Sequence, residues 1–363
     1  MRTRGSRAVT KLLIVGVMVG AAFGTSGCKK LLKKATQGAD AGSTTATGTK
    51  AGGADDPDDQ LQEKLDEYIK CLNSLSSSVH AAQKRYLTKI PKTGPKGNEG
   101  WADIYKLPDG AASKCATGVV KAKAMLPKNP ALETAGEDFS KYASELDPMI
   151  TQMDKYFENK DYRDDKWAKA KDMHPKLMAA WTNFNKADNQ LHATLDGITK
   201  PLAQRMLSRI EREDGKRFAY HRKHVLNTGR ELVEASDPAG EDATVDFNLL
   251  NAAYTEFEKS VDELSSYGGS HKTDLTDQKK ASHWPMADHN YDQFVDKANA
   301  FKKSTKEYLR CLRDAPAKAK TTAGKIDPEK IPTCPDGRVG EVADQVVKKY
   351  NEFIRTSNDS QFP

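Results

Sequence analysis

The chain has 363 residues, of which 30% are charged and 37% hydrophobic, and its formal net charge is +6. The charge is unevenly placed: residues 1–27 carry +4 and residues 28–50 another +4, which leaves −2 for residues 51–363. A domain that binds a polyanion carries a basic excess on its folded part. This chain has no such excess, so we expect no nucleic-acid partner. The length is typical of about two domains.

The first residues predict an export signal. A leader with four bases precedes the apolar run LLIVGVMVGAAFG at residues 12–24, and the letters TSGC then end at Cys28. A basic leader, a short apolar run and small residues before the cleavage point are typical of a secretory signal. The run is shorter than the roughly 20 residues that a membrane-spanning helix needs. A cysteine at this point resembles a bacterial lipobox, so residues 1–27 are predicted to be a lipoprotein signal peptide and Cys28 to be lipidated.

Two other interpretations of this segment stay open. It could be an ordinary cleaved signal with an incidental Cys28, or an uncleaved anchor. Thr25 is an unusual residue for a lipobox at its position, where an aliphatic side chain is more common. Lys29, rather than Asp, follows Cys28, which resembles outer-membrane sorting. We therefore expect a protein lipid-anchored in the cell envelope, facing the periplasm, on the outer rather than the inner membrane.

Residues 28–55 are predicted to be a lipidated cysteine and a flexible tether. The run KKLLKK at residues 29–34 either binds an anionic leaflet beside the lipid or is a solvated spacer. Residues 35–55 contain no large apolar side chain. Such a segment cannot bury enough surface to offset its ordering entropy. We expect it to stay disordered and to hold the folded part near the membrane.

Residues 56–363 carry helical periodicity and no convincing strand. The first helix begins at Asp56-Pro57, a cap followed by proline at the first helical position. Its apolar residues recur every three or four positions: Leu61, Leu65, Tyr68, Leu72, Leu75, Val79, Ala82 and Tyr86. A loop rich in proline and glycine follows, and a short helix capped by Asp109 is expected to run to about Met125.

Six further helices are predicted along the rest of the chain. One carries apolar residues from Phe139 to Tyr156 and either kinks or restarts at Pro148. The next begins near Asp164, and a long charged helix follows Pro201. Another begins near residue 246 and stops at Gly268-Gly269, and the last two are centred on residues 291–308 and 339–353. The fold class is therefore all-α. We expect an elongated helical bundle of about seven to nine helices without a sheet, built either as one domain or as two packed helical sub-bundles.

Four cysteines remain beside Cys28. Cys71, Cys115, Cys311 and Cys334 are an even number in a chain predicted to be exported, which favours two disulfides over free thiols. Local pairing, Cys71 with Cys115 and Cys311 with Cys334, is our prediction. The loop between residues 88 and 109 is long enough to return the chain the roughly 24 Å from the end of the first helix to Cys71.

No residue pattern in the chain predicts catalysis. Gly-x-Ser-x-Gly, P-loop and dinucleotide glycine motifs are absent. His221 and His224 share one face of a predicted helix, and His283 and His289 lie on either side of Trp284-Pro285. These histidines are weak metal candidates, because a metal site needs three or four convergent ligands and the sequence places only two together. We expect no cofactor, no metal site and no enzymatic activity.

Three segments resemble a known family. They are KYFENKDYRDD at residues 155–165, followed by a helix with His174, then YIKCLNSL at 68–75 and KKYNEFIRTSN at 348–358. This pattern is similar to that of the YiiG-like bacterial lipoproteins, whose domain is catalogued as domain of unknown function 3829. The resemblance would cover roughly residues 60–357. It implies a helical periplasmic lipoprotein and brings no activity and no catalytic residue.

Two functional hypotheses follow. The first is a non-catalytic envelope protein that is anchored to the membrane through the lipid on Cys28 and presents a helical surface to an envelope protein partner. The second is a small-ligand or metal-binding periplasmic module that uses a cleft between helices, with His221, His224, His283 or His289 as ligands.

Overall fold

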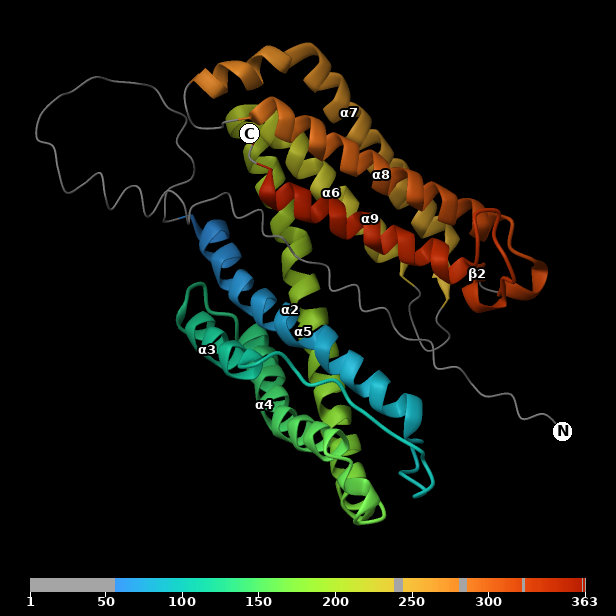
Figure 1. Cartoon of the computed structure of the whole chain (residues 1–363). Coiled ribbons are helices and arrows are strands. Elements are labelled where there is room, and N and C mark those ends of the chain that lie inside the picture. The colour runs from blue at the N-terminus through green and yellow to red at the C-terminus, as the bar shows by residue number, and fades with distance from the viewer. Residues whose placement is uncertain (1–55, 238–243, 281–285, 322–323, 361, 363) are drawn as a thin grey trace, which may run out of the picture. The chain divides into compact units, whose positions relative to one another are not determined.

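The computed structural model describes residues 56–237, 244–280, 286–321, 324–360 and 362. These residues form eight α-helices, joined by short 3-10 turns and one minimal sheet (Figure 1). The all-α prediction is confirmed. The described chain divides into two compact units, one ending at Leu202 and the other beginning at Ala203. The predicted signal peptide, the lipidated Cys28 and the predicted tether all lie outside the described residues.

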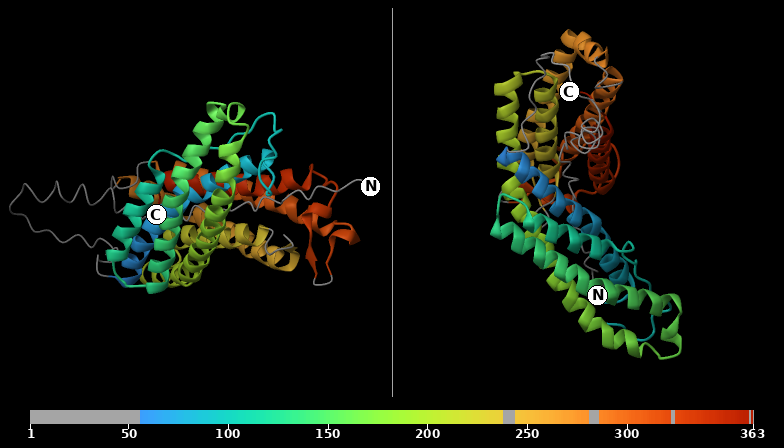
Figure 2. Two further views of the ribbon diagram at one scale, coloured as in Figure 1. Left: turned by 90° about the horizontal axis from the view of Figure 1, so that it is seen from below. Right: turned by 90° about the vertical axis from the view of Figure 1, so that its left-hand side faces the viewer.

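The first unit is built from α2 (Pro57–Lys89), α3 (Ala111–Ala124), α4 (Pro130–Glu158), the 3-10 turn η1 (Asp161–Arg163) and the first part of α5 (Ala168–Asp214) (Figures 1 and 2). Helix α2 begins as predicted: the Asp56 carboxylate accepts a hydrogen bond from the Asp58 amide, and Pro57 is its first residue. Its eight predicted core residues all lie buried or half-buried, so the periodicity located its inner face.

The second unit is a closed bundle of four helices. Helices α6 (Phe218–Ser236), α7 (Phe247–Lys280), α8 (Ala287–Arg313) and α9 (Val339–Asp359) each pack against the next, and α9 packs back against α6. Their inner faces bury one aromatic core that includes Phe257, Phe294, Phe301 and Phe353. The α8–α9 connection holds the 3-10 turns η2 (Ala317–Ala319) and η3 (Pro328–Lys330).

A two-stranded antiparallel sheet is the one departure from an all-helical chain among the described residues. It pairs β1 (Val245–Asp246) with β2 (Lys325–Ile326), and Val245 lies opposite Ile326. Both side chains are buried. The strands are two residues long, which is too short for a period-two pattern to be visible in the sequence.

Several predicted helix ends are wrong. Helix α5 continues through Pro175 and Pro201 and ends at Asp214, before Gly215 in a left-handed conformation. The predicted charged helix after Pro201 is therefore the end of α5 plus α6. Helix α7 passes Gly268-Gly269 and bends at His271 instead. Helix α4 runs unbroken through Pro148, and α3 is preceded by Gly110, not capped by Asp109. Within the described residues, no helix is long and apolar enough to cross a membrane.

Candidate interaction surfaces

Both predicted cysteine pairs come together in the structure. Cys71 on α2 bonds Cys115 on α3, with 4.4 Å between their Cα atoms, and Cys311 on α8 bonds Cys334 in the loop before α9, with 5.0 Å. Each bridge lies within one unit. The first bridge joins the two helices on either side of a long connection, and the second joins a loop to the helix that precedes it, so the predicted local pairing is confirmed. They stabilise the fold and supply no reactive thiol.

The weak metal candidates do not form a metal site. His221 and His224 lie on one face of α6, and the Nδ1 atom of His224 is 3.7 Å from a carboxylate oxygen of Glu263 on α7. Burial lowers the pKa of both imidazoles, which favours their neutral form. His289 contacts Gln293 instead, and His283 lies outside the described residues. Among the residues that the structure describes, no three His, Cys, Asp or Glu side chains are grouped to hold a metal ion.

Two other histidines take part in the packing of the first unit. The His174 ring bonds the Tyr86 hydroxyl at 2.9 Å and the carbonyl oxygen of Lys92 at 3.0 Å. It therefore ties α5 to the end of α2 and to the loop that follows. His80 lies 3.1 Å from the buried carboxylate of Asp188 across the same pair of helices. Neither contact was predicted, because each joins positions about 90 to 110 residues apart.

An exposed cluster of aromatic and basic side chains covers the end of α2. We call it the Trp101 surface and define it as Arg85, Lys89, Trp101, Asp103 and Tyr105. The Arg85 guanidinium lies 5.4 Å from the ring centres of both Trp101 and Tyr105, and the Lys89 ammonium lies 4.2 Å from that of Trp101. Asp103 accepts a hydrogen bond from Arg85 and fixes it between the two rings. The cations and rings therefore hold one another in place.

The local sequence explains why these rings face solvent. Residues 101–105 alternate: Ala102 and Ile104 are buried, whereas Trp101 and Tyr105 are 46% and 53% exposed. In Figure 1 this segment is an open strand-like trace that returns from the end of α2 to the start of α3. Its inner side chains hold it against the helices, so its outer side chains must point away. On α2, Arg85 and Lys89 are one turn apart and share a face.

The sequence contains signals for this surface that our prediction did not use. Trp-x-Asp-x-Tyr alternates with apolar residues, which indicates an extended segment with one polar and aromatic face. Four lysines and one arginine fall between residues 84 and 96. Neither signal predicts that residues 101–105 fold back over α2. That folding is what brings Arg85 between the two rings.

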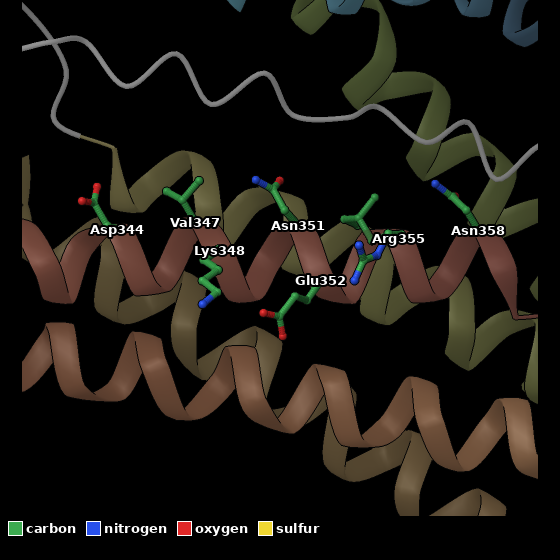
Figure 3. A pocket seen from close by; sticks show the side chains of 8 residues that line it. Asp344, Val347, Lys348, Asn351, Glu352, Arg355 and Asn358 are labelled. Atoms are coloured by element: carbon green, nitrogen blue, oxygen red, sulfur yellow. The ribbon is translucent and has the colours of Figure 1, made fainter.

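A shallow depression follows the outer face of α9 in the second unit. It is lined by Asp344, Val347, Lys348, Asn351, Glu352, Ile354, Arg355 and Asn358 (Figure 3). Figure 3 shows Val347 and Asn351 along one edge of the helix and Lys348 and Glu352 along the edge that faces α8. The Lys349 ammonium, 3.0 Å away, lowers the pKa of Glu352 and keeps it ionised. Apolar Val347 and Ile354 thus lie beside amides and charges of both signs.

Comparisons with known proteins agree on one family. Residues 59–359 match the family model described as "Protein of unknown function (DUF3829)". The "Uncharacterized protein YiiG" of Escherichia coli (strain K12) is 25% identical over 302 residues, which are 82% of this chain and 78% of that protein. No solved structure matches the chain. The resemblance inferred from residues 68–75, 155–165 and 348–358 is thereby confirmed, and the chain belongs to the DUF3829 family of proteins of unknown function.

Proposed function

We propose that this chain is a non-catalytic, lipid-anchored protein of the cell envelope that presents the outer face of α9 to an envelope protein. The anchor in this proposal is Cys28, after removal of residues 1–27, and residues 29–55 are the tether. The apolar run, the small residues before Cys28 and the low-complexity segment after it support this part.

The depression along α9 is the observation that carries the interaction surface. A protein interface combines an apolar centre with a polar rim. Val347 supplies a half-buried apolar side chain beside the buried Ile354, and Asn351 and Asn358 offer amide donors and acceptors. The charges that line the depression are two acids and two bases: Asp344, Glu352, Lys348 and Arg355. Such a surface fits a partner whose contact face is mixed in charge, and it does not favour a polyanion.

Absence of enzymatic activity is part of the proposal. The family description names no reaction, and the sequence carries none of the nucleophile or phosphate-binding motifs considered above. The alternative, a small-ligand or metal-binding module, has no specific observation in its favour: His224 lies beside Glu263, and no three His, Cys, Asp or Glu side chains are grouped to hold a metal ion among the described residues.

A site-specific crosslink in intact cells tests the proposal. A photoreactive phenylalanine analogue replaces Asn351 on α9 in the full-length chain. The matched control places the same analogue at Asn251, an exposed asparagine on α7. We expect one reproducible protein adduct from position 351 and none from position 251. Mass spectrometry of the same material is expected to find a diacylglyceryl group on the peptide that begins at Cys28.

Each part can fail separately. The same set of abundant proteins captured from both positions would contradict the α9 surface. An unmodified Cys28, or a peptide that still contains residues from before Cys28, would contradict the lipid anchor.

A further inference from the structure

The Trp101 surface lies within a stretch of net positive charge at the end of α2 and in the loop that follows it. Residues 84–105 hold four lysines and one arginine against Glu99 and Asp103, a net charge of +3 in a part of the chain that carries −2 overall. Asp103 is already paired with Arg85. Lys84, Lys89, Lys92 and Lys96 are exposed, and none of them forms an ion pair with another described residue.

Two exposed aromatic side chains contact two of these bases, Arg85 and Lys89. Trp101 and Tyr105 are among the few large apolar side chains that the described surface exposes. The Arg85 and Lys89 cations lie over their faces. Trp and Tyr with an apolar body and a polar edge are enriched at the level of lipid headgroups. Lysine stems reach past such rings to place their ammonium groups among anionic phosphates.

We propose that the Trp101 surface, together with the exposed Lys84, Lys92 and Lys96 of the same stretch, docks the folded body on an anionic lipid bilayer. The occupant is a lipid surface rather than a protein, because residues 84–105 carry a net charge of +3 and expose a tryptophan and a tyrosine, the side chains enriched at the level of anionic headgroups. This inference rests on the proposed function, since a lipid at Cys28 is what would hold the body within reach of a membrane. A single acyl anchor binds marginally, and a basic surface is the kind of second signal that makes binding stable.

Vesicle binding by the chain from Ala51 to Pro363 tests the inference. This chain keeps every described residue and omits Cys28 and the run KKLLKK, so neither the lipid nor the basic leader contributes. The probes are vesicles of phosphatidylglycerol with phosphatidylcholine, and vesicles of phosphatidylcholine alone. Co-sedimentation at low salt measures the bound fraction, and Trp fluorescence reports a blue shift if Trp101 enters the interface.

Two variants of the Trp101 surface are compared with matched controls in the second unit. Trp101→Ala with Tyr105→Ala is matched by Leu249→Ala, since Leu249 is 60% exposed. The quadruple change Lys84→Gln, Lys89→Gln, Lys92→Gln and Lys96→Gln is matched by glutamine at four other exposed lysines: Lys303, Lys318, Lys320 and Lys325. Circular dichroism confirms that each variant keeps its helices.

We expect the unsubstituted chain to bind only the anionic vesicles. Loss of the four lysines should weaken binding by roughly fivefold per charge, loss of the rings by about fivefold or more, and the controls should bind normally. Equal binding to both vesicle types, no binding, or equal loss from the control quadruple would each overturn the inference. The inference would also be overturned if an acidic protein bound the Trp101 surface and thereby released the chain from anionic vesicles. The tested chain lacks Cys28, so absence of vesicle binding would contradict only the docking inference. The lipid anchor is tested separately, by mass spectrometry of the Cys28 peptide.

Discussion

Two buried tyrosines in this protein depend on a helical glycine. The Tyr68 ring on α2 lies against Gly136 on α4, and the Tyr291 hydroxyl on α8 lies against Gly268 on α7. A Cβ added at Gly136 would be 2.2 Å from the Tyr68 ring, and one at Gly268 would be 2.0 Å from the Tyr291 oxygen. Both distances are shorter than any van der Waals contact, so a side chain at either position would have to displace the tyrosine.

Adjacent glycines in α7 give a prediction with a built-in control. Gly268→Ala should lower the free energy of unfolding by about 1–3 kcal/mol, because it overpacks against Tyr291. Gly269→Ala should leave it unchanged or raise it by up to about 1 kcal/mol, since nothing lies within 4 Å of the added atom and alanine favours helix. Urea unfolding followed by circular dichroism measures both. If Gly268→Ala left the free energy of unfolding unchanged, Tyr291 would be able to move aside without cost.

The elements of the fold were predictable to different degrees. Helices with a wide apolar face and a clear cap, such as α2, were located almost to the residue. The ends of α5 and α7 were not, because proline and glycine usually end helices and here do not. At Pro175 the ring of the preceding residue, His174, is held by Tyr86, and at Gly268 the absence of a side chain admits Tyr291. In both cases a tertiary contact outweighs the tendency of proline or glycine to end a helix. The periodicity of the sequence does not reveal that contact.

The disulfides act on connections between elements. The bridge Cys71–Cys115 closes 44 residues of chain and Cys311–Cys334 closes 23. In the chain-entropy account, loops of these lengths contribute about 3–4 kcal/mol each. We predict that replacing either pair with serine lowers the free energy of unfolding by about 2–4 kcal/mol.

Guanidinium unfolding of the oxidised chain from Ala51 to Pro363 measures this loss, with the unsubstituted chain as the reference. Removal of Cys71 and Cys115 should also raise amide hydrogen exchange across residues 90–110, the connection that carries Trp101, Asp103 and Tyr105 of the Trp101 surface. Unchanged exchange there would mean that packing of Ala102, Ile104 and Leu107 alone holds the segment.

At the scale of the whole molecule, the sequence indicated the helical class and the two bridges, but not the surfaces. The Trp101 surface requires that residues 101–105 fold back over α2, and the Tyr86–His174 contact requires that α5 lie against it. These are long-range placements, and a pattern of period 3.6 determines only which side of a helix is buried. The lysines and the rings were visible in the sequence, whereas their proximity was not.

The second unit has a core that closes on itself. Every residue of its aromatic core cluster lies between Phe218 and Phe362, and the last of them is fully buried against Tyr291 and Phe294. Arg222 on α6 holds this end of the chain: its guanidinium donates to the carbonyl oxygens of Ser357 at 2.8 Å and Ser360 at 3.2 Å, and lies over the Phe362 ring. Burial lowers the pKa of Arg222 to about 10, which still leaves it charged at neutral pH.

A fragment of residues 203–363 should therefore fold alone. We expect a helical circular dichroism spectrum, a single cooperative thermal transition and an intact Cys311–Cys334 bridge. A shorter fragment ending at residue 338 keeps the bridge but lacks α9, which supplies Val342, Val346, Tyr350, Phe353 and Ile354 to the core. Without those side chains the inner faces of α6 and α8 are open to water, and burying each large apolar side chain is worth about 1.5–3 kcal/mol. The shorter fragment should show no cooperative transition; if both fragments melt alike, α9 is peripheral to the bundle, and if neither folds, the second unit depends on the first.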